Sequence, residues 1–203
     1  MQRRLFISSL VALPLVTGAA HAAGFNAIDI TGANIGPDYQ LFYSDGKPAS
    51  LRDFKGKYVM LFFGFTQCPD VCPTTLARAT EIKRLLGADG DKLQVVFVTV
   101  DPERDTGPLL AEYMRAFDPT FVAVRGNAEQ TAKAAKDFKI FYRKVPSGSS
   151  YTMDHTALTY VFDAAGKIRL AVKHEQTAQQ VAADVRLLMH PKKDTGFLKG
   201  LFQ

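Results

Sequence analysis

Cys68 and Cys72 carry the most distinctive chemistry of this 203-residue chain, and they are its only cysteines. Each is followed directly by a proline, and an almost uninterrupted apolar run, residues 58–65, precedes them. A buried strand that brings two thiols to the start of a helix suits thiol exchange or the binding of a soft metal ion. The alternative, two small core residues that happen to be neighbours, fits poorly with a cluster at a helix start.

The prolines and the spacing narrow the geometry of this cysteine loop. Pro69 and Pro73 disfavour the helical region for the residue before them. This predicts Cys68 on a turn and Cys72 just ahead of a helix whose first position is Pro73. A helix N-terminus stabilises a thiolate. Three intervening residues, one more than thioredoxin-type enzymes use, allow a disulfide and also let two sulfurs spread around a metal ion. The spacing leaves redox and metal chemistry open.

One of the four histidines is placed to join the cysteines. His174 and His190 stand among charged residues, which predicts solvated surface positions, and His21 lies in the leader described below. His155 ends a small polar loop, residues 149–155, just before an apolar strand. In a thioredoxin-like sheet that loop faces the cysteine turn, because sites gather at strand ends near a topological switch. A histidine with a purely structural role is the alternative.

Two thiolates and one imidazole form a soft set of few ligands, which suits copper, with zinc as the competitor. Met153 is a further soft candidate, although packing explains it better. Asp101 follows the second central strand and is a candidate to orient His155 or the cysteine loop through a hydrogen bond. Equally, it could start a turn before Pro102 and cap the next helix.

The N-terminus reads as a targeting segment. Arg3 and Arg4, the apolar residues 5–16 and the small side chains around His21 predict an export signal over residues 1–22, cleaved after Ala22. The paired arginines also resemble a twin-arginine signal. After export, a close cysteine pair becomes a disulfide unless a metal or a reductant intervenes. The net charge of +5 includes no long basic run, so we expect no nucleic-acid partner.

The remaining patterns predict alternating strands and helices. Apolar runs indicate strands over residues 59–65, 94–100 and 121–124 and a hairpin over 156–162 and 168–172, and helical spacing marks residues 76–86, 109–117, 128–138 and 178–188. A short hairpin or a strand is expected over residues 39–43, with a turn at Asp45 and Gly46. This order predicts an α/β thioredoxin-like fold, with a central mixed sheet flanked by helices and an inserted segment. The domain should cover residues 35–190, followed by a loosely ordered tail, residues 191–203.

Three blocks of this sequence resemble the Sco (SenC) family of copper chaperones for cytochrome c oxidase assembly. They are residues 64–74 around the cysteines, residues 98–106 around Asp101, and residues 154–163 around His155. The resemblance implies that Cys68, Cys72 and His155 bind copper and that Asp101 is a nearby accessory residue. It also implies a role in building the binuclear copper centre of the oxidase. The chain departs from the family at Gln67, where many members carry histidine, and in its apparently cleaved signal, since many relatives stay anchored.

Three functions therefore compete. The leading hypothesis is a metallochaperone that binds one copper ion per monomer and passes it to the copper-binding subunit of the oxidase. It would need a thiol reductant and could receive copper from another donor. The rival is a thiol–disulfide oxidoreductase that keeps the cysteines of that subunit reduced, which leaves enzymatic activity undecided. The third is a redox or copper sensor. We expect a soluble periplasmic protein, or, if the signal is retained, one anchored to the inner membrane.

Overall fold

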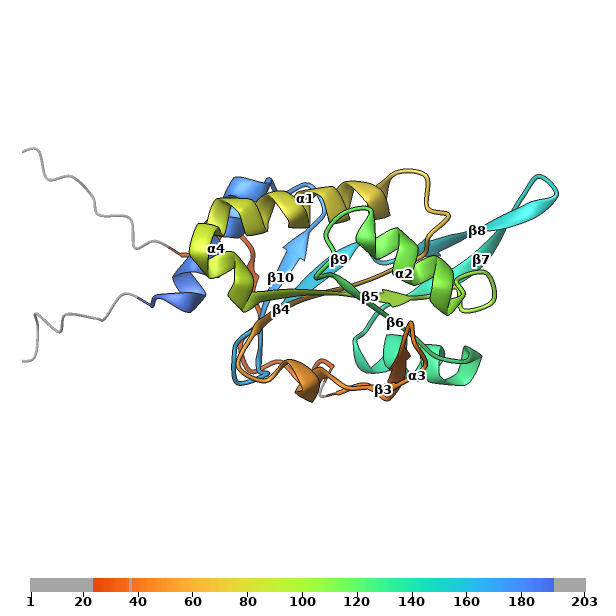
Figure 1. The fold of residues 1–203 in the computed structure, drawn as a ribbon, viewed down its shortest axis with the longest axis horizontal. Coiled ribbons are helices and arrows are strands. Elements are labelled where there is room, and N and C mark those ends of the chain that lie inside the picture. The colour runs from red at the N-terminus through yellow and green to blue at the C-terminus, as the bar shows by residue number, and fades with distance from the viewer. Residues whose placement is uncertain (1–23, 37, 192–203) are drawn as a thin grey trace, which may run out of the picture.

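The elements that carry the cysteine motif belong to one central sheet of a computed structural model that describes residues 24–36 and 38–191. Its eight strands lie in the order β1-β10-β9-β4-β5-β6-β2-β3, and β7 and β8 form a separate two-stranded sheet (Figure 1). The strands are β1 (Ile28–Asp29), β2 (Leu41–Tyr43), β3 (Pro48–Ala49), β4 (Tyr58–Gly64), β5 (Leu93–Thr99), β6 (Val122–Arg125), β7 (Tyr142–Ser147), β8 (Ser150–His155), β9 (Leu158–Phe162) and β10 (Ile168–Lys173). The helices are α1 (Val71–Leu86), α2 (Gly107–Arg115), α3 (Ala128–Asp137) and α4 (Ala178–Met189), with short 3-10 turns at Leu51–Phe54 and Gly87–Lys92.

The centre of the sheet is parallel and its flanks are antiparallel. β4 pairs with β5, and β5 with β6, in parallel, whereas β9 pairs antiparallel with β4 and with β10. Helices α1, α2 and α4 lie above the sheet in Figure 1, and α3 lies below it. This is the mixed sheet with flanking helices that the order of apolar runs predicts, and the inserted segment contains β7 and β8.

Continuous apolar strands produce this core because both faces of the sheet are covered. Every residue of β5 is buried, as is every residue of β4 except the first. Below the sheet, the ring of Phe138 packs against four other aromatic rings, those of Tyr39, Phe63, Tyr160 and Phe162. Burying each side chain of this kind contributes about 1.5–3 kcal/mol. The strand ends that carry the site therefore start from a firmly packed layer.

Two local predictions were wrong. Helix α1 begins at Val71, so Cys72 is its second residue and Pro73 its third, where the sequence predicts a start at Pro73. Proline is tolerated there because the first N–H groups of a helix have no partner within it. Residues 149–155 are not a loop: most of them form β8, joined to β7 by a turn at Gly148, whose φ is 58°.

Two predicted segments fall outside the described residues. They are the export signal, residues 1–22, and the tail apart from Pro191. Among the residues that are described, none of the helices combines the length and the apolar character that crossing a membrane requires.

Candidate metal centre

The cysteine loop leaves the sheet at the end of β4 and enters α1. Cys68 sits on the turn, where its N–H donates to Phe65 O at 3.3 Å. The first helical hydrogen bond follows at once, from Thr74 N–H to Asp70 O at 3.1 Å. Cys68 is half-buried, whereas Cys72 is only 1% exposed. Strand β4 and helix α1 together hold the sulfur of Cys72 inside the fold and the sulfur of Cys68 near its surface.

Gly64 makes room for the buried sulfur. A Cβ atom at this position would lie 2.7 Å from Cys72 Sγ and 2.7 Å from the ring of Phe97. Real carbon atoms do not approach this closely, so any larger residue would push the sulfur or the ring away. The glycine that ends β4 is therefore a requirement of the site.

The two sulfurs influence each other's ionisation. The Cys72 N–H approaches Cys68 Sγ at 3.5 Å, and both cysteines are free thiols in this structure. A hydrogen bond from the Cys72 side chain lowers the pKa of Cys68, and hydrogen bonds from backbone N–H groups add to the shift. The same contact with Cys68, together with burial, raises the pKa of Cys72. The first proton to leave this pair leaves Cys68, so its sulfur is the first of the two to become a thiolate.

His155 reaches the cysteines from the hairpin. It is the last residue of β8, and its Nε2 lies 3.9 Å from Cys72 Sγ. Its Nδ1 lies 3.1 Å from Thr156 O. Because a carbonyl oxygen only accepts, this contact places the proton on Nδ1 and leaves the Nε2 lone pair toward the sulfur. The ring of Phe65 packs edge-on against the imidazole at 5.9 Å.

The spacing of these donors can be compared with that of metal ligands. A sulfur and a nitrogen bound to one ion at about 2.3 and 2.0 Å are separated by roughly 3.5–4 Å. The pair Cys72 and His155 meets that spacing. Among the described residues, however, no group of three or more His, Cys, Asp and Glu side chains is already arranged to hold a metal ion.

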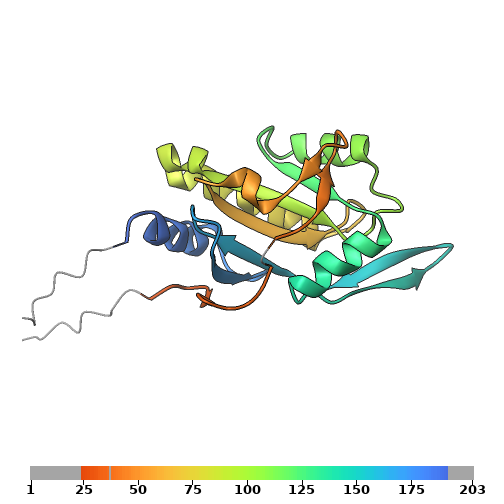
Figure 2. The ribbon, with the colours of Figure 1, turned by 90° about the horizontal axis from the view of Figure 1, so that it is seen from below.

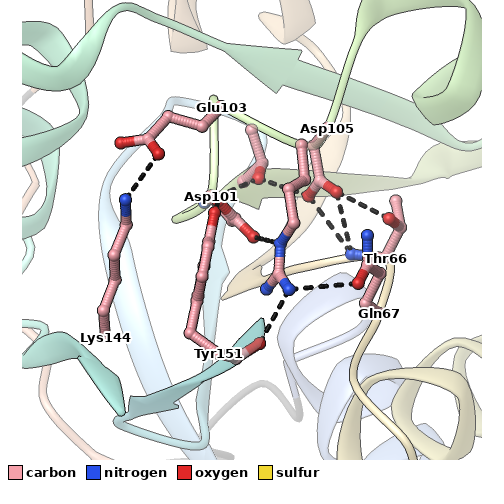
Figure 3. A network of polar contacts seen from close by, with 9 residues as sticks. Thr66, Gln67, Asp101, Glu103, Asp105, Lys144 and Tyr151 are labelled. Atoms are coloured by element: carbon pink, nitrogen blue, oxygen red, sulfur yellow. Dashed lines mark hydrogen bonds and ion pairs between the residues drawn. The ribbon is translucent and has the colours of Figure 1, made fainter. Parts of the chain in front are cut away.

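Asp101 lies behind the site and not beside its donors. Its side chain is fully buried, accepts from Tyr151 Oη at 2.8 Å and pairs with the Arg104 guanidinium. In the described part of the chain it has no hydrogen bond with His155 or with either cysteine. Figure 3 shows that Asp101 instead belongs to a polar network that reaches the hairpin and the cysteine loop.

Asp105, which sequence reasoning missed, holds the cysteine loop directly. Its carboxylate accepts from Thr66 N–H at 3.1 Å, from Thr66 Oγ1 at 2.6 Å and from Thr99 Oγ1 (Figure 3). Burial raises the pKa of this carboxyl, and the threonine hydrogen bonds oppose the shift. Its place in the same motif as Asp101, four residues further on, was the available signal.

The other candidates divide as follows. Met153 is 6% exposed and belongs to the hydrophobic core, in line with a packing role. His190 is exposed and lies 2.7 Å from Asp89. His174 is half-buried and not fully solvated as predicted, because its Nδ1 lies 3.4 Å from the hydroxyl of Thr75, one turn of α1 beyond Cys72.

The fold and the cysteine and histidine motifs together are characteristic of one protein family. The family model for SCO1/SenC matches residues 29–190, and the chain belongs to that family. An SCO2-like protein of Rickettsia felis is 37% identical over 169 residues, which cover 82% of this chain and 76% of that protein.

Solved structures show the same likeness. The copper-bound ScoI of Bradyrhizobium japonicum is 39% identical, with a TM-score of 0.69 over 76% of this chain and 99% of ScoI. BsSco, a member of the Sco family of cytochrome c oxidase assembly proteins in which a disulfide switch has been identified, matches with a TM-score of 0.62 over 81% of this chain and 99% of BsSco. At 24% identity, BsSco shows the fold alone. The predicted Sco resemblance and the predicted fold class are confirmed.

Proposed function

We propose that this protein is a metallochaperone that binds one copper ion with the thiolates of Cys68 and Cys72 and the imidazole of His155. It delivers the ion to the binuclear copper centre of cytochrome c oxidase. The 3.9 Å contact between Cys72 and His155 carries this proposal, because it joins residues 83 positions apart in the sequence at ligand spacing. Membership of the SCO1/SenC family and the copper-bound state of ScoI support copper as the ion.

Each ligand has a distinct part in holding the cargo. Cys68, with its lowered pKa, offers a thiolate at the surface, where an incoming ion arrives first. Cys72 loses its proton only when the ion replaces it, so copper uptake should release a proton. His155 supplies a neutral nitrogen through Nε2. Three protein ligands leave a coordination position open, through which a ligand of the recipient can enter before the ion leaves.

Non-denaturing mass spectrometry of the reduced and oxidised mature protein tests this proposal. We expect one copper ion per reduced monomer and none on the disulfide form, because the disulfide removes both thiolates. Transfer is then measured by mixing the loaded protein with the copper-binding subunit of the oxidase and weighing both partners. Equal copper uptake by the oxidised and reduced forms would contradict the proposal.

A second candidate function is thiol–disulfide exchange with the same recipient subunit. The lowered pKa and partial exposure of Cys68 favour it, because the attacking species is the thiolate. Cys72, buried behind it, would then resolve the mixed disulfide. Both functions need reduced cysteines, so either one requires a thiol reductant in the same compartment.

We also propose that residues 1–22 direct export and are removed after Ala22, which releases a soluble periplasmic protein that begins at Ala23. N-terminal sequencing of protein recovered from its host should begin at Ala23. Full-length chain in the membrane fraction would instead mean that the segment remains as an anchor. This result would leave the copper proposal intact.

A further inference from the structure

The β7–β8 hairpin carries His155 but is not part of the main sheet. Among the described residues its strands pair only with each other, and the hairpin extends beyond the body at the end opposite to α4 (Figures 1 and 2). A lone two-stranded hairpin is marginally stable. Side-chain contacts with the body must therefore fix the orientation of the hairpin, whose last residue, His155, leads through two residues into β9 of the main sheet.

Arg104 makes contacts with both halves of the site. Its Nη1 donates to Tyr151 O of β8 at 2.7 Å and to Gln67 Oε1 at 3.0 Å. Gln67 directly precedes Cys68, and Tyr151 lies four residues before His155. The guanidinium also stacks on the ring of Tyr151, 3.7 Å from its centroid. One side chain thus connects the hairpin to the cysteine loop (Figure 3).

Asp101 fixes the orientation of this arginine. One of its carboxylate oxygens pairs with Arg104 Nε, and the other accepts from Tyr151 Oη. The carboxylate is fully buried and the arginine side chain is 16% exposed. Asp101 holds Nε and the ring of Tyr151 stacks on the plane of the guanidinium, and in this orientation Nη1 donates to both acceptors.

A second aromatic ring extends the connection to the imidazole. The Arg104 guanidinium lies 6.0 Å from the centre of the Phe65 ring, and the imidazole of His155 lies 5.9 Å from the same ring. Phe65 is 1% exposed. The arginine therefore supports the wall against which the imidazole packs.

Stability alone does not account for this arrangement. Arg104 Nη2 is buried without a hydrogen-bond partner among the described residues, which is unfavourable by about 1–3 kcal/mol. Buried ion pairs commonly add little net stability over apolar replacements. The ion pair of Lys144 with Glu103 joins the hairpin to the same loop after β5, but both side chains are exposed, so it should contribute little. Of the described side chains in that loop that contact the hairpin, Arg104 is the one that also reaches the cysteine loop, through Gln67.

We propose that Arg104 is a positioning residue that holds the β7–β8 hairpin on the cysteine loop and so sets His155 at ligand distance from Cys72. The proposal rests on the proposed copper-binding function for its consequence, but the docking of the hairpin is a property of the metal-free protein. Arg104→Lys is the main variant. It keeps the charge beside Asp101 but loses the planar fork that bridges Gln67 and Tyr151.

Amide hydrogen exchange in the metal-free protein tests the docking. In Arg104→Lys, the cross-strand amides of β7 and β8 should exchange about ten- to a hundredfold faster, while the amides of β4 and β5 keep the wild-type rate. Tyr151→Phe, which removes only the hydroxyl that reaches Asp101, should give a smaller change in the same amides. Glu103→Gln, the matched control at the exposed pair, should change them less than about fivefold.

Competition for copper with a chromophoric chelator tests whether the docking of the hairpin affects the copper affinity. Arg104→Lys should weaken copper binding about ten- to a hundredfold, as loss of a ligand-orienting partner does, and Glu103→Gln should not. The proposal would be overturned if the amides of β7 and β8 in Arg104→Lys exchanged at the wild-type rate. It would also be overturned if they exchanged faster while the copper affinity stayed unchanged. If the wild-type protein bound no copper, the proposed function would fall, and the exchange rates would still decide the docking of the hairpin.

Discussion

The two halves of the candidate metal centre are built in different ways. The cysteine loop continues directly from β4 into α1, between a strand that is buried almost throughout and a helix packed on the sheet. The hairpin that carries His155 has a backbone paired only with itself among the described residues, and Met153 is the one buried residue of β8. The thiols lie between two packed elements, whereas the imidazole lies where a hairpin outside the main sheet leads into β9.

Because of this difference, the cysteine loop and the hairpin should differ in how easily they move. A sulfur seated against the end of β4 can move only if the core moves, because interiors are closely packed. The hairpin can shift as a unit if a few contacts change, since no backbone ladder to the main sheet must break. A site that takes up and then surrenders an ion can use such a pairing, with a fixed thiol half and a histidine half held by replaceable contacts.

The largest effect should come from removing the ligand on the hairpin. His155→Ala takes away the imidazole and leaves both thiols, so copper affinity should fall by more than about a hundredfold, beyond the loss of a mere orienting partner. Reaction of the reduced protein with a small aromatic disulfide should persist. His174→Ala is the matched control, because that ring contacts Thr75 and lies outside the proposed ligand set. Unchanged copper affinity with collapsed thiol exchange would assign His155 to redox chemistry instead.

The cysteine half should respond most to a change at Gly64. Gly64→Ala adds a carbon 2.7 Å from Cys72 Sγ, and overpacking of this kind destabilises folded proteins by about 1–3 kcal/mol. Urea unfolding measures the loss, and the copper affinity should fall with it because the sulfur is displaced. Gly24→Ala, where the added carbon meets nothing within 4 Å, is the control and should be neutral or slightly stabilising. A stable Gly64→Ala protein with wild-type copper affinity would show that this half is as adjustable as the hairpin.

The two thiols should also differ in reactivity toward iodoacetamide. Cys68 is half-buried with a lowered pKa, so it should be modified before Cys72, and its rate should fall less than tenfold between pH 7.5 and 6.5. An unperturbed thiol loses about tenfold per pH unit below its pKa of about 8.5. Cys72→Ala removes the main cause of the shift and should restore the ordinary slope. Mass spectrometry of the alkylated protein gives both rates, and modification of Cys72 first would contradict this assignment.

Much of the fold could be predicted because the central strands of the main sheet are long apolar runs in the sequence. Residues 59–65 and 94–100 have few polar interruptions, and the helices around them repeat apolar residues with helical spacing. The hairpin was missed for the opposite reason. Residues 142–155 carry charged or polar side chains on both faces of the ribbon, so no alternation of apolar residues marks them as strands.

The candidate ligands could be identified from the sequence, but the residues that hold them in place could not. Closely spaced cysteines and a histidine before an apolar strand are visible as residue types. The partners of Arg104 lie 37 and 47 positions away, and those distances appear only once the chain is folded. Asp101 was singled out as a direct orienting group because its position after β5 was clear, whereas the arginine between it and the site was not.

The smallest effect should be a pH-dependent one beneath the cysteine loop, at Asp105. Burial raises the pKa of this carboxyl, so its contribution to stability is present at pH below its ordinary value of 3.8 and is lost as the pH rises through the folded-state value. Asparagine does not titrate. At pH 4, Asp105→Asn should be less stable than the wild type by about 1 kcal/mol, since the hydrogen bonds to Thr66 and Thr99 are disturbed.

The difference in stability between the wild type and Asp105→Asn should then narrow toward neutral pH. The reason is that the wild-type carboxylate becomes charged, which makes its burial unfavourable, whereas the amide stays neutral. Thr99→Val sharpens the test: it deletes a hydrogen bond that lowers the pKa of Asp105, so the fall in stability should be larger and should extend to a higher pH. Urea midpoints from pH 4 to 7.5 measure both variants. A difference that widens as the pH rises would mean that the threonine hydrogen bonds outweigh burial at this carboxylate. The cysteine loop would then rest on a stabilised anion, and the fixed half of the site would weaken in acid.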